Sequence, residues 1–294
     1  MPAAAVDPQM GVVRTVKELR ARVDAWRAAG LSVGLVPTMG ALHQGHLSLV
    51  ERSNSLADRT VASIFVNPAQ FAPHEDFGSY PRREETDLEL LRRAGCSLVF
   101  IPAAVEMYPD GFQTSIAVSQ VSQGLCGASR PHFFGGVATV VCKLLNQARP
   151  DIAVFGEKDY QQLLVIRRMV KDLDMPIEIV GAPIVRETDG LAMSSRNAYL
   201  SQEERIVAGR LNKVIAEMAD RLQRGGGVAE AIAFGRAALA DAGFSAVDYL
   251  DVRGADLLDD PGSGALSKNA RVFAAVLLGK TRLIDNWPVE INAR

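Results

Sequence analysis

Cysteine and histidine are scarce in this chain. Its 294 residues include three cysteines and four histidines. The cysteines, at positions 96, 126 and 142, are odd in number, have no framework spacing and lie beside apolar neighbours. We therefore expect reduced, buried thiols in a reducing compartment rather than a disulfide scaffold.

Long apolar runs and a strong net charge are also missing. No run of about 18 apolar residues is present, so no membrane span is expected. Residues 1–10 lack a basic segment followed by an apolar core, which predicts a frayed terminus rather than a signal peptide. The net charge of −2 predicts no general attraction to nucleic acid or to anionic membranes. Hydrophobic residues at 48% and charged residues at 22% are typical of a globular protein with one large or two modest domains.

The first two thirds of the chain alternate strand-like and helix-like segments. The expected strands are apolar throughout and span residues 31–36, 61–66, 98–101, 152–155 and 177–180. Helical spacing falls around and between them, in residues 16–29, 47–56, 84–94, 136–148 and 160–173. Apolar strands separated by helices predict a parallel sheet covered on both faces, and right-handed crossovers make it doubly wound. We assign this α/β fold to a first domain, residues 1–184.

The pattern changes after about residue 183. One long amphipathic helix is expected over 201–224, with an apolar stripe made of Ile206, Leu211, Ile215, Met218 and Leu222. A second helix, 228–242, ends at a glycine, and strands are expected over 247–252, 272–278 and 282–284. Gly279-Lys280 joins the last two strands like a hairpin. These elements predict a smaller C-terminal α+β domain, residues 185–294.

The most informative segment, residues 37–47, follows the first of the buried strands. Gly40 breaks the chain, and His43 and His46 then lie three residues apart with Gly45 between them. This spacing predicts a turn and a helix whose first turn carries both imidazoles on one face. A helix start has unpaired N–H groups and the positive end of the helix dipole, so it attracts anions. The imidazoles add hydrogen-bond donors for phosphate oxygens, and Gly45 leaves room for a bulky ligand.

Two other interpretations of this histidine pair stay open on the residues alone. The pair is also compatible with a zinc site, or with two surface histidines at a helix start. The zinc interpretation has little support, because the only other histidines are His74 and His132 and no Cys-x-x-Cys is present.

Polar side chains also follow the second expected strand and mark the domain junction. Asn67 and Gln70 carry amide donors and acceptors suited to fixing an uncharged polar group such as a hydroxyl. An ordinary Asn-Pro turn is the alternative there. At the junction, Ser194, Ser195 and Arg196 supply two hydroxyls and a guanidinium, which suit phosphate oxygens. A polar interdomain linker is the alternative for this segment.

A fourth cluster follows the expected strand over 152–155. Gly156 permits close backbone approach, Lys158 supplies a positive charge, and Asp159 suits a helix cap, a ribose or a metal. Gln162 lies on the first turn of the next helix and faces the same edge of the sheet. Taken alone, this cluster is also compatible with a solvated helix cap. Ligands of such sheets bind beyond the carboxyl ends of the strands, so we expect all four clusters to meet at one site.

Together these segments resemble the pantothenate synthetases (pantoate–β-alanine ligases), relatives of the nucleotidylyltransferases with a His-x-Gly-His signature. The segments that carry the resemblance are Pro37-Thr38-Met39-Gly40-Ala41-Leu42-His43-Gln44-Gly45-His46, Phe65-Val66-Asn67-Pro68-x-Gln70-Phe71, Tyr80-Pro81-Arg82, Phe155-Gly156-Glu157-Lys158-Asp159-Tyr160-Gln161-Gln162 and Gly190-Leu191-Ala192-Met193-Ser194-Ser195-Arg196-Asn197. The resemblance runs from about Thr15 to Asn286. His-x-Gly-His alone marks only the superfamily, whereas Gly-Glu-Lys-Asp-Tyr-Gln-Gln and Met-Ser-Ser-Arg-Asn in the same chain are specific.

The resemblance implies an ATP-dependent amide ligation on a Rossmann-like nucleotidylyltransferase domain. The carboxylate of (R)-pantoate attacks the α-phosphorus of ATP, which gives pantoyl adenylate and pyrophosphate. The amine of β-alanine then attacks the acyl carbon and releases pantothenate, a precursor of coenzyme A, together with AMP. Such chemistry needs positioning and charge neutralisation rather than a protein nucleophile, in keeping with the lack of an evident Ser–His–Asp or Cys–His set. The resemblance further implies Mg²⁺ bound with ATP, and a cytoplasmic homodimer.

The same resemblance implies roles for individual residues. The expected catalytic residues are His43, His46 and Lys158, and His46 falls on the proton donor of the family. The residues expected to hold ATP are Met39, Gly40, Ala41, Leu42, His43, Gln44, Gly45, His46, Gly156, Glu157, Lys158, Asp159, Val185, Met193, Ser194, Ser195 and Arg196. Those expected to bind pantoate and β-alanine are Asn67, Gln70 and Gln162.

Two positions depart from the family pattern. Relatives commonly have Arg-Pro-x-His-Phe-x-Gly-Val before the buried helix. Here His132 stands one place early and Phe133 occupies the usual histidine position, so His132 receives no role. Thr86-Asp87 stands where some relatives have paired aspartates, so protein ligands of Mg²⁺ are left unassigned.

Two further functions stay open beside the ligase. A nucleotidylyltransferase that acts on a different substrate shares the His-x-Gly-His turn but does not explain Gln70 and Gln162 together. A non-catalytic nucleotide-binding module would tolerate loss of His46 or Lys158, and both are present. The exchange of pyrophosphate into ATP, with different acceptors, separates these functions from the ligase.

Overall fold

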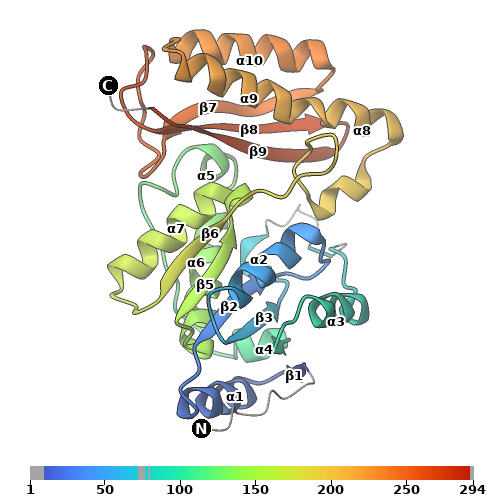
Figure 1. Ribbon diagram of the computed structural model, residues 1–294, viewed down its shortest axis with the longest axis vertical. Coiled ribbons are helices and arrows are strands. Elements are labelled where there is room, and N and C mark those ends of the chain that lie inside the picture. The colour runs from blue at the N-terminus through green and yellow to red at the C-terminus, as the bar shows by residue number, and fades with distance from the viewer. Residues whose placement is uncertain (1–9, 72–76, 79, 292–294) are drawn as a thin grey trace.

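The larger of two sheets forms the centre of the N-terminal domain (Figure 1). The structure is a computed structural model that describes residues 10–71, 77–78 and 80–291. Six parallel strands lie in the order β1-β4-β3-β2-β5-β6. They are β1 (Gly11–Val13), β2 (Val33–Thr38), β3 (Arg59–Ile64), β4 (Leu98–Phe100), β5 (Ile152–Gly156) and β6 (Glu178–Ala182). The predicted Rossmann-like α/β fold is confirmed.

Helices cover both faces of this sheet. They are α1 (Val16–Ala28), α2 (Gln44–Asn54), α3 (Glu84–Arg93), α4 (Ala104–Met107), α5 (Leu125–Ser129), α6 (Phe133–Ala148) and α7 (Tyr160–Asp172). One core contains residues of α1, α6 and α7 together with Leu35 of β2, and the other contains residues of α2 and α3 together with Val36. Neighbouring residues of a strand point to opposite faces, so the uninterrupted apolar run of β2 serves both cores.

The strand order reverses between β2 and β5. From β2 the chain continues through β3 to β4 on one side, whereas β5 and β6 lie on the other side. A doubly wound sheet has a crevice for ligands at the carboxyl ends of the strands where this reversal occurs. The turn with the two histidines follows β2, and the segment with Lys158 follows β5. The topology therefore brings these two predicted clusters to the same place.

A smaller α+β domain follows, as predicted. Its elements are α8 (Gln202–Ala208), α9 (Arg210–Gln223), α10 (Val228–Ala242), β7 (Ala246–Gly254), β8 (Ala270–Leu278) and β9 (Thr281–Val289). The strands form an antiparallel sheet in the order β7-β8-β9, and the hairpin at Gly279-Lys280 joins the last two. In Figure 1, α9 and α10 cover the side of this sheet that is turned away from the larger domain. The exact domain boundary, between residues 184 and 185, stays a prediction.

One predicted helix is in fact two. The expected helix over 201–224 ends its first part at Gly209, and α9 begins at the next residue. A Cβ at Gly209 would lie 2.6 Å from Oδ2 of Asp189, so only glycine lets this carboxylate approach the break. Ile206 consequently leaves the predicted apolar stripe and is 68% exposed, whereas the other four members are buried.

Two smaller expectations also need correction. No strand is expected at residues 11–13 from the sequence, yet β1 pairs in parallel with β4 through Val12 and Val99. A strand of three residues is too short to show an alternation of its own, and its partner lies far along the chain.

The expectation of three buried thiols is corrected as well. Cys96 is buried, but Cys126 and Cys142 are half-buried, and all three thiols are free.

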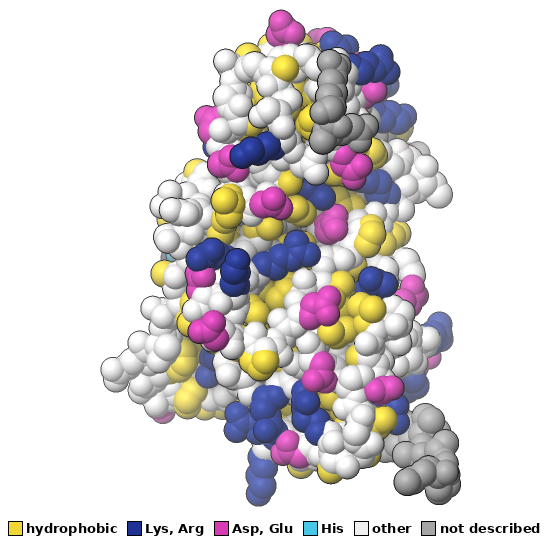
Figure 2. All heavy atoms as spheres, turned by 60° about the vertical axis from the view of Figure 1, so that its left-hand side comes forward, with side chains coloured by type: hydrophobic (Ala, Val, Ile, Leu, Met, Phe, Trp, Pro, Cys, Tyr) yellow, Lys and Arg dark blue, Asp and Glu magenta, His cyan; other side chains and the backbone are white. Residues whose placement is uncertain are grey.

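The described surface mixes both signs of charge. Figure 2 shows one face, on which basic and acidic side chains are interspersed around exposed hydrophobic ones. Within the described part of the chain, no helix has both the length and the apolarity needed to cross a bilayer.

Candidate active site

A cleft of about 580 Å³ lies at the carboxyl ends of β2 and β5 and extends to the C-terminal domain. Most of the predicted site residues line it: Met39, His43, Gly45, His46, Asn67, Gln70, Gly156, Lys158, Asp159, Gln162, Val185, Met193, Ser194, Ser195 and Arg196. Five predicted ATP residues lie outside this lining, namely Gly40, Ala41, Leu42, Gln44 and Glu157. The cleft is thus the common meeting point of all four clusters.

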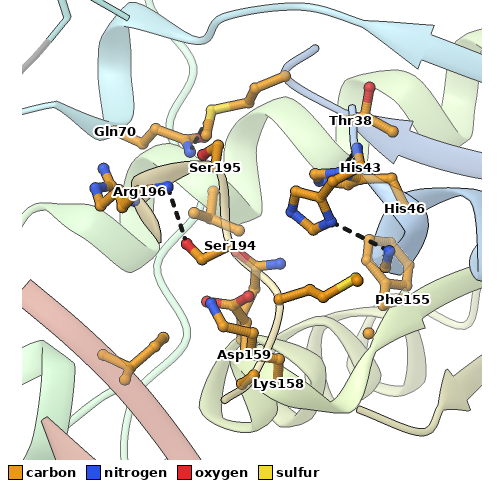
Figure 3. A pocket seen from close by; sticks show the side chains of 18 of the residues that line it. Thr38, His43, His46, Gln70, Phe155, Lys158, Asp159, Ser194, Ser195 and Arg196 are labelled. Atoms are coloured by element: carbon orange, nitrogen blue, oxygen red, sulfur yellow. Dashed lines mark hydrogen bonds between the residues drawn. The ribbon is translucent and has the colours of Figure 1, made fainter. Parts of the chain in front are cut away.

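The groups surround one space. In Figure 3, the imidazoles of His43 and His46 stand on one side, and Ser194 and Ser195 stand on the other, with Lys158 below them in that view. Segments that are far apart in the sequence therefore present hydrogen-bond donors and positive charge to a shared volume.

The two histidines form the cap of α2. His43 is the N-cap residue, and its Nδ1 accepts the backbone N–H of Gly45 at 3.1 Å. Nδ1 of His46 accepts the backbone N–H of His43 at 3.4 Å, and the two ring centroids lie 4.1 Å apart. Because each Nδ1 acts as an acceptor, the hydrogen-bond network assigns the proton of each neutral ring to Nε2. A Cβ at Gly45 would lie 2.9 Å from Cε1 of His43, so a glycine is needed between them.

Burial keeps both imidazoles neutral near pH 7. Removal from water lowers the pKa of His43 to about 4, and the positive charge of Lys158 acts in the same direction. The pKa of His46 falls to about 3, again mainly through burial, with smaller effects of His43 and Lys158. Loss of water disfavours the charged imidazolium, and a nearby cation adds repulsion. The site therefore offers two neutral N–H donors beside the ammonium group of Lys158 to an anionic ligand.

Asp87, in the first turn of α3, holds the turn between β2 and α2. Its Oδ2 accepts the N–H of Ala41 at 2.9 Å and its Oδ1 accepts the N–H of Leu42 at 2.8 Å. The residue is 2% exposed, and burial raises its pKa while the two backbone N–H groups oppose the rise. Gly40 adopts φ +80° beside it, and a Cβ there would lie 2.9 Å from Oδ2. Asp87 thus fixes the backbone that leads into the histidine pair.

The residues that the structure describes do not form a protein cage for a metal ion. Both oxygens of Asp87 accept backbone N–H groups, so its carboxylate serves the turn between β2 and α2. Among the described residues, no group of three or more histidine, cysteine, aspartate or glutamate side chains is placed to hold a metal. His74, which the zinc interpretation would need, lies outside the described residues.

Asn67 caps, and Gln70 ends, a 3₁₀ turn, η1 (Pro68–Gln70), that packs on α6. The amide nitrogen of Asn67 donates to Oε1 of Gln70 and to the carbonyl of Gly136, both at 3.1 Å. Its Oδ1 accepts the hydroxyl of Tyr108 at 2.7 Å and the N–H of Ala69 at 3.3 Å. The hydrogen bonds of Asn67 are therefore taken up by the protein, and their effect is to orient Gln70 at the wall of the cleft.

The segment over 185–197 folds back on itself before it reaches the cleft. The N–H of Met193 donates to the carbonyl of Val185 at 3.0 Å. Ser194 then caps the 3₁₀ helix η3 (Ser195–Tyr199), because its Oγ accepts the N–H of Arg196 at 3.3 Å. Asn197 closes the segment by donating to Oε1 of Glu187 at 2.7 Å. These bonds hold the backbone that carries Ser194, Ser195 and Arg196, which are together called the phosphate clamp below.

Sequence reasoning missed part of the lining. Arg130 and Phe133 both line the cleft, with the guanidinium 3.9 Å from the ring centroid, and Arg130 donates to the carbonyl of Gln70 at 3.2 Å. His132 is exposed and stands outside the lining, consistent with giving it no role. The departure of His132 and Phe133 from the family's Arg-Pro-x-His-Phe pattern was the one sequence signal in this part of the lining. Lys280, in the hairpin between β8 and β9, and Arg282, near the start of β9, also line the cleft, and no motif marked them.

The likeness to known proteins extends over nearly the whole chain. Residues 11–288 match the family model of pantoate-beta-alanine ligase. The pantothenate synthetase of Paramagnetospirillum magneticum is 57% identical over 279 residues, which cover 95% of this chain and 98% of that protein.

Solved structures agree with this likeness. The crystal structure of pantothenate synthetase from Thermus thermophilus has a TM-score of 0.88 and 47% identity, and covers 96% of this chain and 100% of that one. The pantoate-beta-alanine ligase of Francisella tularensis, crystallised with beta-gamma ATP and beta-alanine, has a TM-score of 0.79 and 31% identity, over 95% of this chain and 97% of that one.

Proposed function

The chain belongs to the pantoate–β-alanine ligase family, and from this premise we propose which residues carry out its two chemical steps. The enzyme condenses (R)-pantoate with β-alanine through pantoyl adenylate, with conversion of ATP to AMP and pyrophosphate. One observation carries the assignment. The histidines after β2, Lys158 after β5 and the Ser194–Arg196 segment all line a single cleft.

The first step forms the adenylate. An oxygen of the pantoate carboxylate forms a bond to the α-phosphorus, the bond from that phosphorus to the bridging oxygen breaks, and pyrophosphate leaves. Negative charge grows on the departing oxygens, so fixed donors near them stabilise the transition state. We assign this task to the Nε2–H groups of His43 and His46 and to the ammonium of Lys158. His46 acts as a neutral hydrogen-bond donor, because its low pKa disfavours an imidazolium.

The second step forms the amide. The neutral amine of β-alanine attacks the acyl carbon, a C–N bond forms, AMP leaves, and the nitrogen releases a proton. Gln70 and Gln162 hold pantoate, with Gln70 also bordering the β-alanine position, and Asn67 supports Gln70 from behind. Holding the two reactants in a fixed geometry removes much of the entropic barrier of this step.

Mg²⁺ enters as part of the ATP substrate and neutralises charge on its phosphates. We further propose a homodimer in the cytoplasm, as is typical of the family. We also propose a domain boundary between residues 184 and 185, with the C-terminal domain closing over the nucleotide.

Exchange of labelled pyrophosphate into ATP tests the assignment. Wild-type enzyme is expected to exchange only when pantoate is present, and Lys158→Ala to lose about 100-fold in rate. Lys171→Ala, at the exposed end of α7, is the matched control and should exchange at the wild-type rate. Exchange that needs a different acceptor would favour the nucleotidylyltransferase. Full exchange by Lys158→Ala would refute the assigned role of Lys158.

A further inference from the structure

Two consecutive residues of β9, Asp285 and Asn286, are polar and almost completely buried, at 3% and 2% exposure. Each is hydrogen-bonded to a different segment of the active site. Neighbouring side chains of a strand leave the backbone in different directions, so one dipeptide reaches both segments. Neither residue lines the cleft itself.

Asn286 holds the segment that carries Lys158. Its Nδ2 donates to the carbonyl oxygens of Glu157 and of Lys158, both at 2.9 Å. A primary amide has two N–H donors, and here both are used on consecutive carbonyls. The direction in which the Lys158 side chain leaves the backbone is therefore tied to the C-terminal domain.

Arg271, on β8, fixes the amide of Asn286. Its guanidinium donates to Oδ1 of Asn286, and donates to Oε2 of Glu157 at 3.1 Å. The same group lies 3.7 Å from the ring centroid of Tyr160, and the residue is only 7% exposed. With Oδ1 accepting from an arginine, the amide cannot flip, so Nδ2 must face the two carbonyls.

Asp285 holds the base of the phosphate-clamp segment. It accepts from both terminal nitrogens of Arg186, at 2.7 and 3.0 Å, in a bidentate pair. The Arg186 side chain also donates to the carbonyl of Gly190 at 3.0 Å, and the backbone of Arg186 forms an isolated antiparallel β-bridge with Ala192. Ser194 lies two residues after Ala192. The ion pair of Asp285 with Arg186 therefore fixes the extended backbone that leads to Ser194, Ser195 and Arg196.

We propose that Asp285 and Asn286 are positioning residues for adenylate formation, which set Lys158 and the Ser194–Arg196 segment against the same triphosphate. This inference rests on the roles proposed above for those residues. Neither member of the pair touches substrate. Their effect is to make the geometry of both cationic segments depend on the seating of the C-terminal domain, and a misplacement of about 1 Å at a reacting group costs about 100-fold in rate.

Asn286→Asp is the sharpest variant, because it keeps the shape and the contact with Arg271 but replaces the Nδ2 donors by an oxygen facing two carbonyls. We expect the rate of pantoate-dependent pyrophosphate exchange to fall about 10- to 100-fold. Aminolysis of supplied pantoyl adenylate by β-alanine, measured on the same sample, should change by less than about twofold, because that step has no triphosphate to position. Asn286→Ala, which adds no charge, should likewise slow pyrophosphate exchange and leave aminolysis nearly unchanged.

Asp285→Asn tests the contact of Asp285 with Arg186. It weakens the bidentate pair with Arg186, and we expect the KM for ATP to rise about tenfold with a smaller change in kcat. Val276→Ala is the stability control, since Val276 is fully buried in the C-terminal core and its loss lowers stability alone. This control should lower the melting temperature and leave the ratio of the two half-reaction rates unchanged.

The ratio of half-reaction rates does not depend on how much enzyme is folded, so partial misfolding of a variant leaves the test decisive. An Asn286→Asp enzyme whose two half-reactions fall equally, or whose exchange is unaffected, overturns the inference. Lys158→Ala, measured in parallel, distinguishes failure of the proposed function from failure of the positioning role. If it leaves exchange intact, the proposed function of Lys158 fails, whereas slow exchange in that variant beside normal exchange in Asn286→Asp refutes only the positioning role.

Discussion

His43 and His46 each use Nδ1 for the backbone of their own turn, which leaves only Nε2 for a ligand. The same contacts that cap α2 thus select the tautomer that can donate to phosphate oxygens. Burial then lowers both pKa values, so the donors are neutral over the physiological range. The chemical role proposed for the two side chains thus rests on the same contacts that cap α2.

His46→Ala is the first prediction at this scale. Pantoate-dependent pyrophosphate exchange should slow about 100- to 1000-fold, because a donor aimed at developing charge is lost. The Kd for ATP, from calorimetric titration, should rise by less than about tenfold, since ground-state contacts of the other residues remain. His132→Ala, which removes an exposed histidine outside the cleft, is the control and should behave as wild type. Equal losses in binding and rate would contradict a transition-state role.

The residues that lie in continuous motifs were predictable from the sequence, and several that support them were not. His43, Lys158 and Arg196 follow strands or mark the junction, so their positions could be read locally. Asp87 and Asn286 act through partners 46 and 128 residues away. Such contacts depend on how distant segments pack, and no local pattern reports them.

At the scale of elements, the close approach of α6 to η1 governs where Gln70 lies. A Cβ at Gly136 would be 2.2 Å from the carbonyl oxygen of Ala69 and 2.9 Å from the nitrogen of Gln70. A Cβ at the adjacent Gly135 would have its nearest neighbour, the carbonyl oxygen of Ile116, at 3.8 Å. Gly136 therefore has no space for a methyl group, whereas the adjacent Gly135 has, and substituting each by alanine compares the two situations.

Gly136→Ala should lower the free energy of unfolding by about 1–3 kcal/mol, since backbone atoms must move to admit the methyl group. It should also raise the KM for pantoate, because η1 carries Gln70. Gly135→Ala should leave the KM unchanged and raise stability by up to about 1 kcal/mol, from better helix propensity. Urea unfolding and steady-state kinetics measure both effects. Similar behaviour of the two variants would refute the close-approach argument.

Element types were predictable because the apolar strands and amphipathic helices are strongly periodic. The break at Gly209 was not, because it reflects the approach of Asp189 from another segment rather than a local preference. A glycine within a helical pattern is tolerated in many helices, so its presence did not decide the matter.

For the molecule as a whole, the histidines make stability depend on pH. The unfolded chain binds these protons near pH 6.5, whereas the folded pKa values are about 4 for His43 and about 3 for His46. The histidines therefore do not lower the free energy of unfolding above about pH 6.5. That free energy falls as the pH drops from there toward the pKa values of the folded protein. At pH 5 the loss from His46 alone is about 2 kcal/mol.

Urea unfolding of wild type and of His46→Ala, at pH 7 and pH 5, measures this effect. The variant should lose about 2 kcal/mol less than wild type between the two pH values. The same loss in both proteins would show that His46 is not held neutral by the fold.

Closure of the C-terminal domain is the second prediction at this scale. The cleft takes its lining from both domains, so a ligand that contacts both should draw them together. Small-angle scattering should give a smaller radius of gyration with a non-cleavable ATP analogue plus pantoate than without ligand. β-Alanine alone is the control and should leave the radius unchanged. Identical scattering with and without the ATP analogue and pantoate would count against a hinge.

β8 contributes alternate residues to two hydrophobic cores. Phe273 belongs to the core with α6 and α7, where its ring centroid is 6.1 Å from that of Tyr160, whereas Val272 and Ala274 belong to the C-terminal core. A polypeptide that stopped at residue 184 would leave the Tyr160 side of that contact facing water, and exposed apolar patches promote aggregation. Producing the two halves in separate cultures is thus a poor strategy, and a split version of this protein calls for co-expression of both fragments.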